Sequence, residues 1–218
     1  MVKGVIFDMD GLMFDTERLW DKMWEPACKA LGLPLPEDLA AFSASCRGLA
    51  GDNLRSQVAK YIPGDPQRLL DKVWQMADER FAQGVPCKKG LKELLTALDD
   101  RGMPRIVASS SPRTMIEMNL QNTGTARYFH DVVSGTEVKH SKPAPDTFLL
   151  AAEKLHLDPK DCLVLEDSFN GVRAGYAAGC VTVMVPDMMQ PTEEITQLYD
   201  RKCEDLLEVR DLLIEGKL

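Results

Sequence analysis

From residue 84 onward, short apolar runs alternate with segments of helical periodicity, and this alternation constrains the fold more than any other feature of the chain. Strands that alternate with helices form βαβ units, and therefore a parallel sheet covered by helices on both faces. The N-terminal run 2–8 adds a buried strand, because it is β-branched and aromatic and ends at acidic residues and a glycine. We predict an α/β fold with a Rossmann-like parallel sheet. The other expected strands are 105–108, 131–134, 162–165 and 181–185.

Between residues 15 and 83 the pattern is helical throughout, with apolar residues spaced by three and four. Its first part predicts one helix that ends at Gly32. We therefore predict an all-helical domain over residues 15–83, inserted into an α/β core of residues 1–14 and 84–218. The large aromatic residues of the insertion recur at helical spacing, so we expect them to form its interior; they are Trp20, Trp24, Trp74 and Phe81.

The charge balance limits the partners of the chain, which has 26 Lys and Arg against 34 Asp and Glu and a formal net charge of −8. Nucleic acids and anionic membranes attract positively charged surfaces, so we expect no nucleic-acid and no membrane partner. The first residues have the pattern of a strand rather than of a secretion signal. The six cysteines are scattered without metal-binding spacing. We expect a cytoplasmic monomer with reduced cysteines.

Two carboxylates, Asp8 and Asp10, follow the first predicted strand and precede Gly11. Residues two apart on extended backbone point to the same side. They lie at the carboxyl end of the strand, where open α/β sheets bind their ligands. Two adjacent anions repel each other unless a cation or a shared proton joins them. The pattern therefore indicates a cation-binding or catalytic site, and a solvated Asp-x-Asp-Gly turn is the alternative.

Three consecutive serines and a lysine supply groups that suit an anion. Ser109, Ser110 and Ser111 lie between a predicted strand and a helix, where hydroxyls and free N–H groups suit a phosphate oxygen. We predict Ser109 as the best phosphate contact, and Ser111 as the N-cap of a helix that begins at Pro112. Lys142 lies in a proline-restricted loop, where its ammonium suits a phosphoryl group or a carboxylate. A solvated surface lysine is the alternative.

Glu166 and Asp167 directly follow the apolar run 162–165 and precede another helix. Carboxylate oxygens at strand ends suit magnesium (Mg²⁺) better than a softer metal. Acidic residues that complement the helix dipole are the alternative. All four clusters end predicted strands of one sheet, so we expect them to converge on one edge.

The four clusters, in this order, resemble the motifs of the phosphatase branch of the haloacid dehalogenase superfamily. They read FDMDG at 7–11, VASSS at 107–111, SKPAPD at 141–146 and LEDS at 165–168. The resemblance covers essentially the whole chain, including a helical cap after the first motif, and is closest to the β-phosphoglucomutase-like and sugar-phosphatase group. It implies a Mg²⁺-dependent phosphatase that hydrolyses small phosphorylated metabolites, such as sugar phosphates, through an aspartyl-phosphate.

The resemblance also implies a role for each motif residue. Asp8 would attack phosphorus, and Asp10 would protonate the leaving alcohol and then deprotonate water. Ser109 and Lys142 would hold phosphoryl oxygens, with Ser110 helping through its backbone N–H.

Mg²⁺ would be held by Asp8, Asp167 and the backbone carbonyl of Asp10, with Glu166 assisting directly or through water. The helical domain would close over the substrate as a cap and recognise the leaving group. In the cap, Arg47 and Asp52 are the expected specificity residues.

Other activities share parts of this pattern. Asp10 disfavours a dehalogenase, because displacing halide needs no acid on the leaving group. Residues 30–59 contain no lysine, which disfavours a phosphonatase of this family. A receiver-like phospho-acceptor that is not an enzyme would lack Asp10 and the large insertion, so it is a minor alternative.

The main alternative is a phosphosugar mutase. The resemblance leads us to expect, in a mutase, a histidine near Trp20 and an arginine within residues 48–52. Trp20 and Gly51 depart from that pattern, although Arg47 or Arg55 could substitute. These departures favour hydrolysis.

Overall fold

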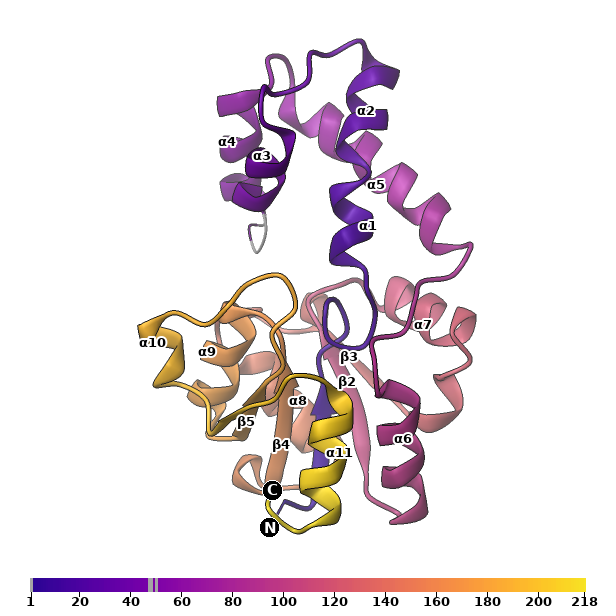
Figure 1. Ribbon diagram of the computed structural model, residues 1–218, viewed down its shortest axis with the longest axis vertical. Helices are drawn as coiled ribbons and strands as arrows, with labels where there is room; N and C mark the ends of the chain where they lie inside the picture. Colours follow the sequence, from indigo (N-terminus) through magenta and orange to yellow (C-terminus); the bar gives the residue numbers. More distant parts are fainter. Residues whose placement is uncertain (1, 47–48, 50) are drawn as a thin grey trace. The chain divides into compact units, whose positions relative to one another are not determined.

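The computed structural model (Figure 1) describes residues 2–46, 49 and 51–218, without the side chains of residues 51 and 53. The chain divides into two compact units: Met1–Asp15 with Val85–Leu218, called the core unit, and Thr16–Gly84, called the helical unit. These boundaries lie within one residue of those expected from the sequence. The action of the helical unit as a cap stays a prediction.

The core unit contains a six-stranded sheet in the order β3-β2-β1-β4-β5-β6, and every pairing is parallel. This confirms the predicted α/β fold. The central strand β1 lies between β2 and β4, with Phe7 opposite both Val107 and Leu165. The carboxyl ends of these three strands therefore meet at one edge. The strands are β1 (Gly4–Phe7), β2 (Arg105–Ser109), β3 (Val132–Ser134), β4 (Cys162–Glu166), β5 (Val181–Met184) and β6 (Arg201–Lys202).

Helices cover the sheet because its apolar side chains point to both faces. One face packs against α8 and α9, in a cluster that includes Ile6, Val164 and Phe148, all fully buried. Figure 1 shows α8 on the far side of the sheet from α11. The helices of this unit are α6 (Leu91–Asp100), α7 (Arg113–Asn122), α8 (Asp146–Lys154), α9 (Phe169–Ala178), α10 (Glu193–Thr196) and α11 (Leu206–Ile214), with short 3₁₀ turns at Ala126–Tyr128, Gly135–Glu137 and Pro159–Asp161.

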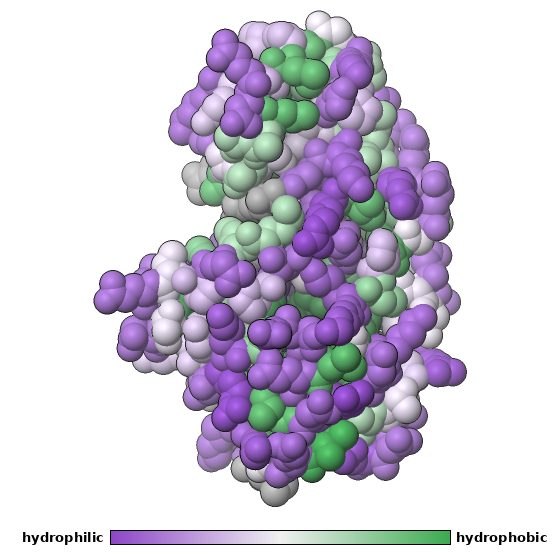
Figure 2. Space-filling model, in the orientation of Figure 1, coloured by the Kyte–Doolittle hydropathy of each residue, from purple (hydrophilic) through white to green (hydrophobic). Residues whose placement is uncertain are grey.

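Hydrophilic residues predominate on the face shown in Figure 2, and apolar residues occur there in small groups. None of the described helices is both long and apolar enough to cross a membrane. The six cysteines are free thiols, and all except Cys87 are buried.

The helical unit has an apolar core of its own, to which Trp24, Phe42 and Val73 contribute. Asp65 is the N-cap of the longest helix of this unit, α5, and its side chain accepts a hydrogen bond from the Gln67 N–H at 2.9 Å. The unit consists of α1 (Glu17–Asp21), α2 (Trp24–Leu31), α3 (Leu39–Cys46), α4 (Gly51–Tyr61) and α5 (Pro66–Phe81).

Two expectations about this unit were wrong. The single helix expected up to Gly32 is two helices, because Pro26 cannot donate a backbone hydrogen bond and its ring would clash with the carbonyl of Lys22. Proline is tolerated in the first turn of a helix, so a new helix, α2, begins at Trp24. Trp74, expected inside, is 41% exposed, whereas Trp24 and Phe81 are buried as expected.

Candidate active site

The predicted residues at the ends of β1, β2 and β4 lie at one edge of the sheet. The pairing continues past β1, because the Asp8 N–H donates to the Leu165 carbonyl at 3.0 Å. Asp8, Ser109 and Glu166 are all buried, at 7%, 1% and 0% exposure. Buried polar groups need partners, and each of these three has one among the predicted residues.

Lys142 joins two of the strand ends. Its ammonium donates to Asp8 Oδ1 at 2.6 Å, to Glu166 Oε1 at 2.8 Å and to the Ala108 carbonyl at 3.0 Å. All three of its donors are therefore used, and the side chain is only 4% exposed. The ammonium also lies 4.6 Å from the ring centroid of Phe148. The surface-lysine alternative is thereby excluded.

The cluster contains more carboxyl groups than ammonium groups. Burial alone would lower the pKa of the Lys142 ammonium, but the carboxylates of Asp8 and Glu166 outweigh burial and raise it. Burial and the nearby Glu166 together raise the pKa of Asp8 well above its ordinary value, although Lys142 opposes them. One ammonium therefore faces several buried carboxyl groups.

The donor set fits a hard divalent cation. Carboxylate oxygens of Asp8, Glu166 and Asp167 all lie within 4.8 Å of one another, and the three residues are buried. Mg²⁺ is commonly held by one or two carboxylates, with water and phosphate oxygens completing its shell. A bound cation would also offset the repulsion that raises the pKa of Asp8.

Gly11 leaves space for this cluster. Its φ of +86° favours glycine, and a Cβ there would lie 2.2 Å from Asp167 Oδ2. Gly171 does the same for Glu166, because its Cβ would lie 1.6 Å from Oε1. The other Glu166 oxygen accepts hydrogen bonds from the N–H and hydroxyl of Ser168, at 2.9 and 3.0 Å. Glu166 is thus fixed between Lys142 and the start of α9.

Asp10 is held by two serines. Its Oδ2 accepts from the Ser111 hydroxyl at 2.8 Å and from the Ser109 hydroxyl at 3.3 Å. Its Oδ1 is buried without a hydrogen-bond partner among the residues that the structure describes. One oxygen of Asp10 is therefore anchored, and the other accepts no hydrogen bond from the described residues.

Ser111 is the side chain beside Asp10 whose contact the sequence analysis did not predict. It was expected to be the N-cap of a helix beginning at Pro112, but Pro112 is the N-cap and α7 begins at Arg113. The Ser111 carbonyl accepts from the Ser134 hydroxyl at 2.7 Å, which ties this loop to β3. The available signal was the run of three serines, of which capping would explain only one.

Ser110 and Asp52, two further predicted residues, have partners other than the residues of this network. Ser110 is exposed, and its hydroxyl lies 3.5 Å from that of Ser141. Asp52 is exposed on α4 and pairs with Arg55 at 2.5 Å. Arg47 falls outside the described residues. The roles of these residues stay predictions.

Comparison with known proteins points to the same family as the four sequence motifs. A family model described as haloacid dehalogenase-like hydrolase matches residues 2–179. The chain is 34% identical to a Drosophila melanogaster protein named "probable pseudouridine-5′-phosphatase", covering 90% of this chain and 88% of the relative. It is 29% identical to hexitol phosphatase B of Escherichia coli K12, covering 97% of each.

A solved structure extends the comparison to the fold. The crystal structure of a HAD family hydrolase from Deinococcus radiodurans, with bound phosphate and sodium, matches with a TM-score of 0.80 at 27% identity. The match covers 99% of this chain and 96% of that one. The likeness therefore includes both the sheet-containing and the helical parts of the chain.

Proposed function

The chain belongs to the haloacid dehalogenase-like hydrolases and is a phosphoric monoester hydrolase, and we propose that it hydrolyses a small phosphorylated metabolite through a phosphorylated Asp8, with Mg²⁺ as cofactor. The observation that carries this proposal is the buried cluster in which Lys142 bridges Asp8 and Glu166. The names of the relatives support a phosphorylated carbohydrate or nucleoside as the substrate class.

Asp8 and Asp10 divide the chemistry between them. An Asp8 oxygen attacks phosphorus, and the bond from phosphorus to the alcohol oxygen breaks while Asp10 gives that oxygen a proton. Water then attacks the aspartyl-phosphate and gives a proton to Asp10, which releases inorganic phosphate and restores both carboxyl groups. Ser111 and Ser109 keep Asp10 in place through both steps.

The phosphoryl group must be positioned and its charge neutralised, which is most of what phosphoryl transfer requires. Lys142, Ser109 and the Ser110 N–H would bind its oxygens. Asp8, Asp167 and the Asp10 carbonyl would hold Mg²⁺, with Glu166 in support. A bound Mg²⁺ supplies positive charge that stabilises the transferring phosphoryl group.

Removing the metal should stop the reaction. In a panel of hexitol, hexose and nucleoside monophosphates, we expect phosphate release with Mg²⁺ to fall at least ~100-fold in excess chelator, and to return when Mg²⁺ is added. Phosphate release that persists in chelator would contradict the metal assignment. Interconversion of sugar phosphates without release would indicate the mutase, and stable phosphorylation without turnover the phospho-acceptor.

Replacing Ser111 by Ala should impair proton transfer to the leaving group. We expect the single-turnover rate of alcohol release to fall about 10-fold with an alkyl phosphate, since general acid catalysis contributes ~10²–10⁴-fold and the variant only loosens the position of Asp10. With p-nitrophenyl phosphate, whose leaving group needs little protonation, the single-turnover rate of nitrophenol release should change less than about 2-fold.

Ser110→Ala is the matched control for Ser111→Ala, because the Ser110 hydroxyl contacts Ser141 and not Asp10. Any effect of Ser110→Ala should be the same for both leaving groups. An equal loss for both leaving groups in Ser111→Ala would show that Ser111 does not act through Asp10.

A further inference from the structure

The strand β3 ends in a buried polar side chain, as its neighbour β2 does. Ser134, the last residue of β3, lies opposite Ser109 in the register of the two strands and is fully buried. A buried hydroxyl costs free energy unless it is hydrogen-bonded. The partners of Ser134 belong to the serine loop after β2 and to the turn after β3.

The direction of the Ser134 hydroxyl is fixed by these partners. It donates its single proton to the Ser111 carbonyl at 2.7 Å. The hydroxyl oxygens of Ser134 and Thr136 lie 2.8 Å apart, and Thr136 is the donor there, since Ser134 has no second proton. The Thr136 N–H donates to the same Ser134 oxygen at 3.2 Å. All donor and acceptor positions of this hydroxyl are therefore used.

Helix capping explains only the acceptor side of this arrangement. Ser134 is the N-cap of the 3₁₀ turn Gly135–Glu137 and accepts from the Thr136 N–H, which is a common contact of serine at a turn. The proton that Ser134 donates to Ser111 is not needed for capping. It joins the end of β3 to the loop that follows β2.

The 3₁₀ turn is itself held by its surroundings. A Cβ on Gly135 would lie 2.6 Å from Ser141 Oγ and 3.0 Å from Ser110 Cα, so the turn packs closely against two loops of the site. At its other end, Glu137 accepts from Arg113 Nε at 2.7 Å, and Arg113 is the first residue of α7. The turn therefore gives the Ser134 hydroxyl a firm support.

Ser111 connects this support to Asp10. The Ser111 N–H donates to Ser109 Oγ at 3.0 Å, and its carbonyl accepts from Ser134. Its hydroxyl donates to Asp10 Oδ2 at 2.8 Å. The backbone of Ser111 is thus held on both sides of the side chain that contacts Asp10.

We propose that Ser134 is a positioning residue for proton transfer at Asp10, and that it acts by holding the Ser111 carbonyl and thereby the Ser111 hydroxyl. The inference rests on the proposed function, in which Asp10 exchanges protons with the leaving group and with water. Proton transfer requires the acid to be within hydrogen-bond reach of the reacting atom. A displacement of about 1 Å far from the reacting atoms can cost ~10²-fold in rate, so loss of this support has a measurable effect.

Ser134→Ala tests the proposal through the leaving group. The single-turnover rate of alcohol release from an alkyl phosphate should fall about 3- to 10-fold, the range that one lost hydrogen bond provides. Nitrophenol release from p-nitrophenyl phosphate should change less than about 2-fold. In the double variant with Ser111→Ala, the rate with the alkyl phosphate should equal that of Ser111→Ala alone, because Ser134 acts through Ser111. Equal losses for both leaving groups, or losses that multiply in the double variant, overturn the assignment.

Thr182→Val is the matched control. The Thr182 hydroxyl is also buried and also donates to a backbone carbonyl, that of Cys180, at 3.3 Å on the strand β5. Any effect of Thr182→Val should be the same for both leaving groups. A loss confined to the alkyl phosphate in this variant would show that the effect is not specific to Ser134, and would overturn the assignment.

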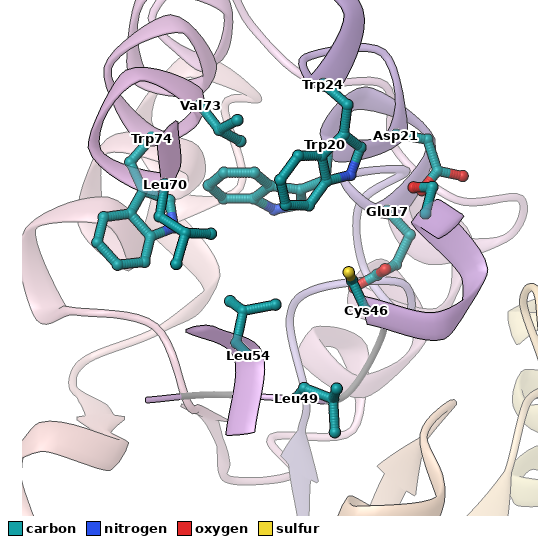
Figure 3. Close-up of a pocket in the computed structure, with 11 residues that line it drawn as sticks. Glu17, Trp20, Asp21, Trp24, Cys46, Leu49, Leu54, Leu70, Val73 and Trp74 are labelled. Carbon is teal, nitrogen blue, oxygen red and sulfur yellow. The ribbon is translucent and has the colours of Figure 1, made fainter. Parts of the chain in front are cut away.

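The helical unit provides an internal reference for folding. All three tryptophans of the chain, Trp20, Trp24 and Trp74, line one pocket within that unit (Figure 3). Tryptophan emission therefore reports on the folding of the helical unit and should be the same in Ser134→Ala and wild type. A changed emission would mean that the substitution acts through a general change of the fold rather than through Ser111.

A measurement without substrate separates this assignment from the proposed function. The rate at which the Ser111 N–H exchanges with solvent deuterium, followed by NMR, should rise about 3- to 10-fold in Ser134→Ala. It should stay unchanged in Thr182→Val. If no compound releases phosphate, the phosphatase proposal fails, and the exchange rate alone decides whether Ser134 holds Ser111. An unchanged exchange rate in Ser134→Ala overturns the assignment.

Discussion

Replacing Asp8 by Asn is expected to reduce phosphate release at least ~10⁴-fold, because loss of a nucleophile removes the covalent route entirely. The amide has nearly the same shape as the carboxylate, so the loss should come from chemistry and not from misfolding. The measurement is single-turnover phosphate release with Mg²⁺ and the best substrate of the panel. Residual activity above a few per cent of wild type would exclude Asp8 as the nucleophile.

The same variant should not lose stability in chelator. Burial and Glu166 raise the pKa of Asp8 in the metal-free fold, so folding favours its protonated form. The stability of the metal-free protein therefore falls as the pH rises from the ordinary aspartate range toward the raised pKa. An amide is uncharged like the protonated acid, and at pH 7 it avoids this cost.

Urea unfolding in chelator at pH 7 tests that expectation. The free energy of unfolding of Asp8→Asn should equal or exceed that of wild type. Asp158→Asn is the control, because Asp158 is exposed and its pairing with Lys160 at 3.0 Å is a surface contact. It should change neither activity nor stability appreciably. A clear loss of stability in Asp8→Asn would mean that the ionised carboxylate is needed for folding.

Replacing Lys142 by Met should have the second largest effect, on both activity and stability. It would leave the carboxylates of Asp8 and Glu166 buried without their shared ammonium. Removing one partner of a buried ion pair costs about 3–5 kcal/mol, and we expect a loss in this range in chelator at pH 8. Activity should fall by ~10²–10³-fold, the usual effect of removing one electrostatic contact to the transition state.

The pH dependence of this loss identifies its cause. If repulsion between uncompensated carboxylates destabilises the variant, protonation relieves it, and the loss should be smaller at pH 5 than at pH 8. Added Mg²⁺ should restore part of the lost free energy of unfolding. Lys160→Met is the matched control, since Lys160 is 74% exposed, and its stability should change by less than about 1 kcal/mol. A loss independent of pH and Mg²⁺ would indicate a packing defect.

The sequence was sufficient to predict the core and the main cluster because both depend on local patterns. Alternating strands and helices fix a parallel sheet, and parallel strands end at one edge, so Asp8, Ser109 and Glu166 had to meet. The contact of Ser111 could not be predicted, because its hydroxyl could either accept from an N–H of the following helix or donate to Asp10, which is about a hundred residues away along the chain.

The helical unit was harder to predict for a related reason. Helical spacing identifies the face of a helix that is apolar but not whether another helix covers it, so Trp74 was wrongly placed in the interior. The strand β6, with two exposed residues, carries no apolar signal at all. Pro26 did carry a signal, and the break between α1 and α2 follows from its missing N–H.

The position of β1 in the sheet also affects how the protein is made. β1 leaves the ribosome first, but its two neighbours, β2 and β4, begin only at residues 105 and 162. At ~5–20 residues per second, the strand that precedes Asp8 waits roughly 8–30 seconds for both partners. The helical unit can complete its own apolar core during that interval. Translation thus completes all residues of the helical unit before it completes the residues of the candidate active site.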